Sequence, residues 1–297
     1  MKVVISGSHG LVGAPLAKAF KSIGHEVSAL VRRAPRDSSE IQWTPYELLD
    51  PGKLEGAEAL IHLAGENIAE GRWTDARKQR IRDSRVKATH LLSESLARMS
   101  KPPQVFVCAS AIGYYGNRGP EILREDSAPG QDFLARVCVD WEKATGPASS
   151  QGIRTVNARF GVILSKDGGA LKKMLTPFRL GAGGEVGNGK QWLSWIALDD
   201  VIGVLKYAVA TTSLNGPVNV VAPNPVTNAE FTKALGQALA RPTLFPMPEF
   251  AARLFFGEMA DALLLSSQRV EPERLEHVNY DFKYPDLKTA LAHLLAD

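Results

Sequence analysis

Three glycines near the start of the chain constrain its fold more than any other feature. Gly7, Gly10 and Gly13 follow a short apolar run, residues 3–5, and open a helix-like pattern over residues 11–23. Glycine permits a tight turn after a strand, lets a pyrophosphate approach the backbone, and allows a helix to pack closely on a sheet. Free N–H groups at the start of a helix also attract an anion. This spacing in this context predicts a dinucleotide-binding loop.

Short apolar runs alternate with helical patterns through the first two thirds of the chain. Apolar runs cover residues 3–5, 26–31, 59–63, 105–109, 154–159 and 217–221, and helical patterns cover residues 11–23, 74–99, 133–148 and 199–209. Such alternation is typical of parallel βαβ units. We therefore predict an α/β protein with a Rossmann-type, doubly wound parallel sheet.

The pattern changes in the last third of the chain, which is mostly helical and interrupted by prolines from Pro223 onward. This change predicts a small, mainly helical C-terminal subdomain on the substrate side. We expect the NADP-binding domain to comprise residues 1–165 and to be completed by about 199–222. Residues 166–198 and 223–297 are then expected to form the C-terminal subdomain.

Glycines also gather between Met174 and Trp192. Their density predicts a loop there. Loops that follow the carboxyl ends of parallel strands often carry function, so this one is a candidate lid over a bound substrate. A plain solvent-exposed loop is the alternative that the residues leave open.

The end of the second predicted strand indicates which dinucleotide binds. An NAD-specific site usually places an acidic residue there, to bind the ribose hydroxyls. This chain instead reads Ala29-Leu30-Val31-Arg32-Arg33. Two guanidinium groups can bind a 2′-phosphate through charge-assisted hydrogen bonds, which predicts NADP(H) as the cofactor. The alternative is that one or both arginines are solvated loop charges.

Composition and charge exclude several other classes of protein. A net charge of +3, with no aromatic residues interleaved in the most basic stretch, argues against nucleic-acid binding. No segment reaches the ~18 consecutive apolar residues of a membrane span, and the start lacks a secretory pattern, so we expect a cytoplasmic protein. Cys108 and Cys138 are expected to be reduced core thiols. The scattered histidines and cysteines predict no metal site.

Several motifs carry a resemblance to a known family. The segments SGSHGLVG at residues 6–13, HLAG at 62–65 and SAIGYYG at 110–116 resemble those of the extended (atypical) short-chain dehydrogenase/reductases. AGENI at 64–68, RFGV at 159–162, GGA at 168–170 and SWI at 194–196 resemble, more narrowly, an epimerase-like subfamily of NAD(P)-dependent nucleotide-sugar epimerases. The segment PVTNAEF at 225–231 resembles the start of that subfamily's own C-terminal region of unknown function. The resemblance covers nearly the whole chain.

The resemblance implies cofactor contacts at the pyrophosphate loop, at the NADP-selecting position, at the strand end beside the ribose, and at two further positions. These residues are Gly7, Ser8, Gly10, Leu11, Val12, Gly13, Arg32, Arg33, Leu63, Ala64, Gly65, Glu66, Arg85 and Ser110. On the substrate side, the candidates are Tyr114, Lys190 and Trp192.

Arg85 stands where extended members typically have an asparagine. It falls four residues after Ile81 and three before Ala88, so helical spacing places it on the inward face. A guanidinium on that face needs an anion or a set of acceptors. A cofactor phosphate and a structural salt bridge are the two alternatives.

The usual catalytic groups of the family are missing. Extended members use a Ser or Thr and a YxxxK pair, in which the lysine lowers the pKa of the tyrosine so that it exchanges protons near neutral pH. Alignment on the surrounding motifs places Ala111, Leu134 and Cys138 at those three positions, and no YxxxK occurs between residues 117 and 150.

Two functions are therefore kept open. The first is an NADP(H)-binding, epimerase-like oxidoreductase that acts on an unidentified small molecule, such as a nucleotide sugar or a carbonyl compound, without the Tyr-Lys pair. Its proton donor would be Tyr114, Tyr115 or Ser110. The second is a non-catalytic NADPH-binding sensor, in which cofactor occupancy sets the shape of the protein for a partner. Fold analogy also offers a homodimer through the helices at 74–99 and 133–148, and the residues leave the oligomeric state open.

Overall fold

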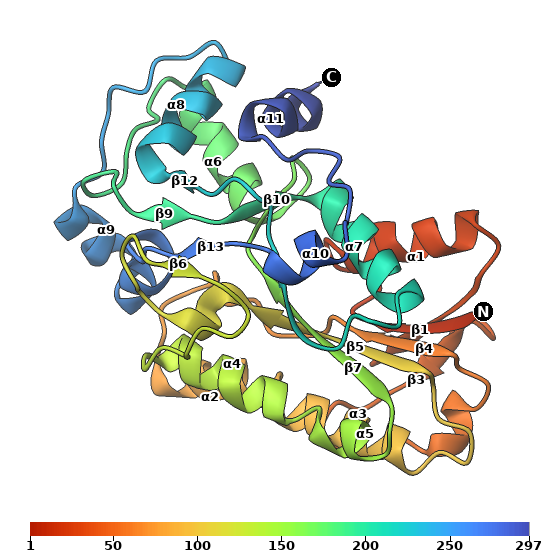
Figure 1. Ribbon diagram of the computed structural model, residues 1–297. Helices are drawn as coiled ribbons and strands as arrows, with labels where there is room; N and C mark the ends of the chain where they lie inside the picture. The colour runs from red at the N-terminus through yellow and green to blue at the C-terminus, as the bar shows by residue number, and fades with distance from the viewer. Residues whose placement is uncertain (297) are drawn as a thin grey trace.

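A seven-stranded parallel sheet lies at the centre of the protein, whose computed structural model describes residues 1–296 (Figure 1). The strand order is β11-β7-β5-β4-β1-β2-β3, and every neighbouring pair is parallel. The predicted doubly wound sheet is thus confirmed. Its strands are β1 (Lys2–Ser6), β2 (Glu26–Val31), β3 (Glu40–Gln42), β4 (Ala59–His62), β5 (Val105–Ala111), β7 (Arg154–Phe160) and β11 (Gly216–Val220).

Helices cover both faces of this sheet (Figure 1). One face carries α1 (Gly13–Ser22), α7 (Leu198–Ala210) and α10 (Glu273–His277), and the other carries α3 (Val86–Ala97), α4 (Phe133–Lys143) and α5 (Gly146–Ser150), with α2 (Asp75–Asp83) ahead of α3. Helix α1 buries Leu16 and Phe20 against apolar side chains of β1 and β2. Because the order of the strands reverses beside β1, a crevice opens there at the carboxyl ends of the strands.

A second hydrophobic core lies beyond the carboxyl ends of the sheet. Trp195 is completely buried in it, among apolar side chains of α6, α8 and α11. The helices of this region are α6 (Gly169–Arg179), α8 (Asn228–Ala238), α9 (Glu249–Phe256) and α11 (Leu287–Leu295). Its short strands pair as β8 (Val162–Leu164) with β10 (Trp195–Ala197), β9 (Trp192–Leu193) with β12 (Val226–Thr227), and β6 (Ile122–Leu123) with β13 (Arg269–Val270). The predicted helical character of this region is confirmed.

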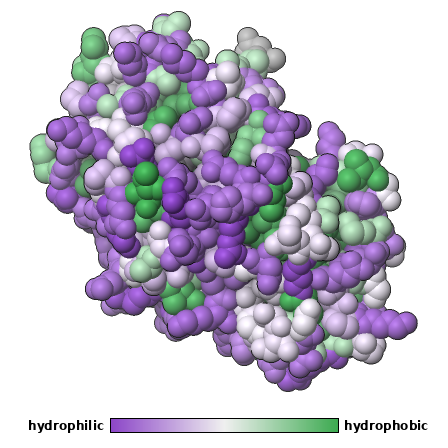
Figure 2. Space-filling model, viewed as in Figure 1, coloured by the Kyte–Doolittle hydropathy of each residue, from purple (hydrophilic) through white to green (hydrophobic). Residues whose placement is uncertain are grey.

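The surface facing the viewer in Figure 2 is mostly hydrophilic, with separate hydrophobic groups rather than one continuous patch. Short turns of 3-10 helix occur at Pro51–Leu54 and Ile112–Tyr115, and one π-helical turn occurs at Ala260–Leu264. No helix within residues 1–296 has both the length and the apolar character to cross a membrane.

The long helix predicted over residues 74–99 is wrong, because the chain breaks it into α2 and α3. Ser84 lies at the break, where its hydroxyl donates a hydrogen bond to the carbonyl of Ile81 (3.1 Å). The same hydroxyl accepts the backbone N–H of Glu66 (3.1 Å). A side chain that bonds the backbone in this way competes with the regular hydrogen bonds of the helix. Arg85 is then the N-cap residue of α3.

Two other predicted boundaries also differ. The helix predicted over 133–148 ends at Lys143, and the separate helix α5 follows with Pro147 in its first turn, where a missing N–H does no harm. The loop predicted between residues 174 and 192 begins later, because α6 extends to Arg179. The apolar side chains of α6 are buried in the second core, and this burial stabilises the helix although glycines are frequent nearby.

Candidate functional site

The glycine loop fits tightly against the turn that follows β4. Gly7 has a φ of 70°, and a Cβ on it would lie 2.9 Å from the backbone carbon of Leu63. A Cβ on Gly13 would lie 2.1 Å from the carbonyl oxygen of Gly7. Both positions therefore require glycine if the loop is to keep this shape.

The start of α1 is open to an anion. The helix has no side-chain cap and no acidic residue in its first turn. Within residues 1–296, the backbone N–H groups of Leu11 and Val12 have no hydrogen-bond acceptor. Unpaired N–H groups at the positive end of a helix dipole suit a phosphate.

Ser6, the last residue of β1, holds the turn after β4 in place. Its hydroxyl accepts the N–H groups of Leu63 (3.1 Å) and Ala64 (3.3 Å) and lies 2.6 Å from Nδ1 of His62. Burial lowers the pKa of His62 to about 4, so the imidazole is neutral at pH 7. The turn beside the glycine loop is thus fixed by a buried, uncharged network.

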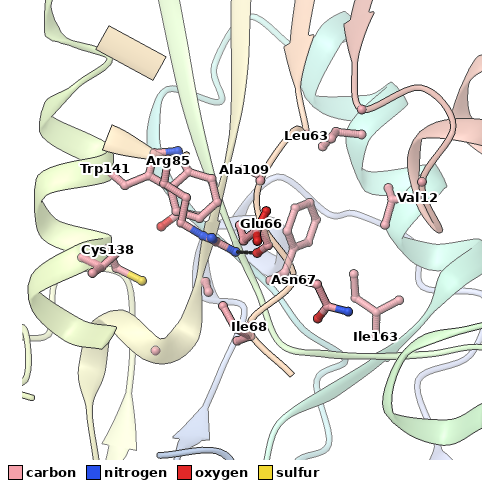
Figure 3. Close-up of a pocket in the computed structure, with 18 of the residues that line it drawn as sticks. Val12, Leu63, Glu66, Asn67, Ile68, Arg85, Ala109, Cys138, Trp141 and Ile163 are labelled. Atoms are coloured by element: carbon pink, nitrogen blue, oxygen red, sulfur yellow. Dashed lines mark hydrogen bonds between the residues drawn. The ribbon is translucent and has the colours of Figure 1, made fainter. Parts of the chain in front are cut away.

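A cavity of about 410 Å³ extends from the glycine loop across the carboxyl ends of β4, β5 and β7 (Figure 3). It brings together most of the predicted cofactor residues, namely Gly7, Gly10, Leu11, Val12, Gly13, Leu63, Gly65, Glu66, Arg85 and Ser110. Four others are not among its lining residues: Ser8, Ala64, Arg32 and Arg33.

The cavity wall also contains residues that the sequence did not single out as cofactor contacts. They are Asn67, Ile68, Ala109, Ala111, Gly113, Leu134, Val137, Cys138, Trp141, Phe160 and Ile163. Asn67 and Ile68 belong to a motif that carried the family resemblance, so a signal for them existed. Phe160 likewise belongs to the RFGV motif at 159–162, whereas Trp141 had no such signal, because a large apolar side chain usually belongs to a core.

Arg85 points into this cavity between Trp141 and the turn after β4 (Figure 3). Its guanidinium donates to the carbonyls of Ile81 (3.1 Å) and Glu66 (2.9 Å) and lies 5.1 Å from the centre of the Trp141 ring. A Cβ on Gly65 would lie 3.4 Å from it, so that glycine leaves room for the guanidinium. No carboxylate within residues 1–296 pairs with Arg85, which excludes the structural salt bridge.

The positions of the absent catalytic groups are part of the cavity wall. Ala111, Leu134 and Cys138, which motif spacing assigns to those positions, all line it. Burial raises the pKa of the Cys138 thiol to about 12, so the thiol is neutral and does not replace a lysine ammonium. This part of the wall is apolar, and Ser110 is the hydroxyl-bearing residue among the described residues that line the cavity.

Ser110 is tied to a buried ion pair behind the wall. Its hydroxyl donates to Glu142 (2.7 Å), and the same carboxylate accepts two hydrogen bonds from Arg159 (2.7 and 2.8 Å). Arg159 is 2% exposed and Glu142 is 12% exposed. The pair joins β5, β7 and α4 and fixes the orientation of Ser110.

The two tyrosines considered as proton donors serve this same network. Tyr115 is completely buried, donates to Asn219 (2.7 Å) and accepts from Arg159 (2.9 Å). Burial raises its pKa to about 12. The Tyr114 ring lies against the Arg159 guanidinium, 3.5 Å from ring centre to carbon, and does not line the cavity. Both positions fit packing better than proton transfer.

The two arginines after β2 differ in their surroundings. Arg33 donates to both oxygens of Glu40 (2.5 and 2.6 Å), and these bonds lower the pKa of Glu40 to about 2. Arg32 is exposed and has no hydrogen bond or ion pair with the described residues. Glu40 lies on β3, a strand that the sequence analysis did not predict. Arg32 is therefore the more available of the two for a phosphate.

A second cavity, of about 420 Å³, contains one of the predicted substrate-side residues. Lys190 lines it, together with Asn117, Gly119, Pro120, Asn188, Gln191, Glu249, Leu265 and Ser267. Trp192 does not, since its ring packs under the Arg269 guanidinium at 4.4 Å. Within residues 1–296, no group of three or more His, Cys, Asp or Glu side chains is arranged to hold a metal ion.

The loop of residues 66–73 connects the first cavity to the C-terminal region. Its first residues line the cavity, and Arg72 donates to the carbonyl of Leu254 in α9 (3.1 Å). Lys173 in α6 donates to the carbonyl of Ala69 (3.0 Å). A change in the cavity wall can therefore reach α6 and α9 through direct hydrogen bonds.

Comparison with known families finds two matching models. The model described as the NAD dependent epimerase/dehydratase family matches residues 3–221. A domain of unknown function, DUF1731, matches residues 247–294. The C-terminal region therefore matches later than the segment 225–231 that resembled its start.

Individual proteins match over nearly the whole chain. An epimerase family protein of Mycobacterium bovis is 44% identical over 292 residues, covering 98% of this chain and 96% of its own. The human epimerase family protein SDR39U1 is 36% identical over 299 residues and covers 100% of both chains.

Among solved structures, human SDR39U1 (isoform 2) with NADPH superimposes with a TM-score of 0.91 at 32% identity, covering 99% of both chains. A nucleoside-diphosphate sugar epimerase from Corynebacterium glutamicum has a TM-score of 0.82 at 41% identity, covering 99% of this chain and 58% of its own.

Proposed function

The chain belongs to the NAD dependent epimerase/dehydratase family, and we propose that it binds NADP(H) and acts as an epimerase-like oxidoreductase on a small molecule. A nucleotide sugar and a carbonyl compound are the proposed substrate classes. The observation that carries the proposal is a cavity that begins at the uncapped start of α1 and ends at the positions of the family's catalytic groups. The presence of NADPH in the structure of human SDR39U1 supports the choice of cofactor.

Each part of the proposed cofactor site has a physical basis. The N–H groups at the start of α1 would bind the pyrophosphate. Arg32, with Arg33, would bind the 2′-phosphate, which a carboxylate at that position would repel. The turn at residues 63–66 would contact the adenosine ribose, which lies between the pyrophosphate and the 2′-phosphate. When bound, the cofactor would supply or accept a hydride, chemistry that no side chain of the protein provides.

Ser110 is the proposed proton donor. Of the three hydroxyl-bearing residues considered, Ser110 is the one that is among the residues lining the cavity. Its proton lies in a hydrogen bond to Glu142, so transfer to a substrate requires the hydroxyl to turn from that carboxylate, whose charge Arg159 offsets, towards the cavity. This arrangement differs from a tyrosine activated by lysine, because no group in the wall lowers the pKa of a phenol.

A non-catalytic NADPH sensor is the second candidate, and two observations favour it. The wall at Leu134 and Cys138 is apolar where the family carries a Tyr-Lys pair. The loop of residues 66–73 bonds the C-terminal region directly, so occupancy of the cavity has a path to α6 and α9. In this case a partner would recognise the shape of the C-terminal region.

The fluorescence of bound NADPH distinguishes the two functions. We expect the purified protein to bind NADPH more tightly than NADH. We also expect at least one compound, in panels of nucleotide sugars, carbonyl compounds and quinones, to oxidise the bound NADPH. Ser110→Ala should then lower the rate of oxidation while leaving NADPH affinity within about twofold. Tight binding without oxidation by any panel member would favour the sensor, and failure to bind NADPH would refute both functions.

The remaining assignments are also proposals. We propose that residues 1–165, completed by 199–222, bind the cofactor, and that residues 166–198 and 223–297 hold the substrate or effector. A cytoplasmic location agrees with two buried cysteines that form no disulfide. A homodimer through α2, α3 and α4 is proposed on fold analogy alone.

A further inference from the structure

We propose that Arg85 makes the cavity select the reduced cofactor, so that the protein binds NADPH more tightly than NADP+. The inference rests on the proposed NADP(H) binding and adds a preference for one oxidation state.

The order of the strands places Arg85 at the nicotinamide half of the cofactor. The pyrophosphate belongs at the start of α1, beside β1, and the 2′-phosphate belongs with the arginines that follow β2. The other half of the dinucleotide must then run in the opposite direction, over β4 and β5. The Arg85 guanidinium extends from the turn after β4 towards Trp141 of α4, the helix that carries Leu134 and Cys138 at two positions of the family's catalytic groups. It therefore faces away from the 2′-phosphate.

The charge of Arg85 is not neutralised by the surrounding protein. Its hydrogen bonds go to two carbonyl oxygens and to the Ser84 hydroxyl (3.5 Å), none of which carries a net charge. The Glu66 carboxylate pairs with Arg77 (2.5 Å) and lies 3.9 Å from Arg80. Farther into the wall, Glu142 is matched by its ion pair with Arg159. The thiol of Cys138 is uncharged, so one positive charge remains beside the cavity.

This remaining charge distinguishes the two forms of the cofactor. The oxidised nicotinamide ring carries a positive charge, whereas the reduced ring is neutral. The wall around it is largely apolar, with Leu134, Val137, Trp141 and Phe160, so the repulsion between ring and guanidinium is weakly screened. We expect the affinity for NADPH to be at least about tenfold higher than that for NADP+. A difference of this size corresponds to the repulsion between two like charges several ångströms apart at an effective dielectric constant of about 20.

Isothermal titration calorimetry with three probes tests the inference. NADPH and NADP+ differ only in the nicotinamide, and adenosine 2′,5′-bisphosphate reports on the adenosine half alone. In the wild type, the dissociation constant of NADPH should be at least about tenfold lower than that of NADP+. Arg85→Met should bring the two dissociation constants within about threefold of each other, and Arg85→Lys, which keeps the charge, should retain the preference. The affinity for adenosine 2′,5′-bisphosphate should stay within about twofold in both variants.

Arg98→Met, which removes an exposed arginine at the far end of α3, is the matched control and should keep the wild-type ratio. Equal affinity of the wild type for NADPH and NADP+ would overturn the inference while leaving the proposed function intact. A preference that persists in Arg85→Met would also overturn it, because another group would then be responsible. If Arg85→Met does not fold, Arg85→Gln takes its place, and equal affinities in the wild type would still overturn the inference. A wild type that binds none of the three probes would instead refute the proposed function.

Discussion

Single residues at the carboxyl end of the sheet decide which ligand the crevice accepts. Arg32 and Arg33 are adjacent in sequence, yet only Arg33 is held, by Glu40 on the next strand. An arginine already bonded to a carboxylate must give up part of that bonding to bind a phosphate, and the carboxylate itself repels the phosphate. At this scale, the two arginines are not equivalent although the sequence presents them as a pair.

Arg32→Met should therefore lower the affinity for NADPH about tenfold, the loss expected for one charge-assisted hydrogen bond. The affinity for NADH should stay within about twofold, because NADH lacks the 2′-phosphate. Calorimetric titration of both cofactors measures the difference. Arg36→Met, which removes an exposed arginine outside the cavity wall, serves as the control. Equal losses for NADPH and NADH would show that Arg32 does not contact the 2′-phosphate.

His62 couples the stability of the protein to pH. Below about pH 6.5 the unfolded chain binds a proton at this imidazole, whereas the folded protein resists protonation until about pH 4. The unfolded state then holds more protons, so the free energy of unfolding falls as the pH falls through this window, by at most about 3 kcal/mol. His62→Asn should flatten this part of the profile in denaturant titrations at pH 4.5 to 7. The same substitution at the exposed His277 is the control, and an unchanged slope in His62→Asn would contradict the assignment.

At the scale of elements, one buried ion pair holds the cavity wall together. Arg159 reaches from β7 to Glu142 of α4, and Ser110 of β5 adds a third hydrogen bond to the same carboxylate. The Arg159 guanidinium also bonds Tyr115 (2.9 Å), which follows β5. This charged contact therefore links α4 to two strands that are already paired with each other in the sheet.

Removing one partner of this pair should be more harmful than removing both. Arg159→Met leaves the Glu142 carboxylate buried without its counter-ion, which should cost about 3–5 kcal/mol of stability in denaturant unfolding. The double variant Arg159→Met/Glu142→Leu should lose less than the single one, because no unpaired charge remains. For comparison, Arg98→Met breaks an exposed pair with Glu94 and should cost less than about 1 kcal/mol. Additive losses in the double variant would show that the pair is not coupled.

At the scale of the whole molecule, a loop at the cavity connects two parts of the chain that have separate hydrophobic cores. The first core lies on the parallel sheet, and the second surrounds Trp195. The loop of residues 66–73 belongs to the first part of the chain, yet it is bonded to α6 and α9 in the second. A ligand that orders this loop will therefore also restrict the C-terminal region.

Hydrogen–deuterium exchange with and without NADPH tests this connection. Saturating NADPH should slow exchange in the 66–73 loop and in the parts of α6 and α9 that it contacts, because opening of these segments would disrupt the occupied site. Helix α5, which packs on β7 away from the cavity, should change little beyond the general stabilisation and serves as the internal reference. Protection confined to the glycine loop would show that the C-terminal region does not respond to the cofactor.

The sequence by itself determined the sheet and the position of the dinucleotide loop. These features depend on local periodicity and on the spacing of three glycines between a strand and a helix, so the runs at β1, β2, β4, β5, β7 and β11 were predicted almost to the residue. The loss of the Tyr-Lys pair was also visible, because Ala111, Leu134 and Cys138 are fixed by motif spacing.

Only the tertiary structure decided the charges and the connections of the site. Glu40 pairs with Arg33 across two strands, and Glu142 pairs with Arg159 between a helix and a strand that are separate in sequence. Arg85 was placed correctly on the inward face, but its lack of a carboxylate partner depends on which groups of other elements fold against it. Periodicity specifies which face of an element is buried, whereas charge compensation depends on contacts between distant segments, and those contacts exist only once the chain has folded.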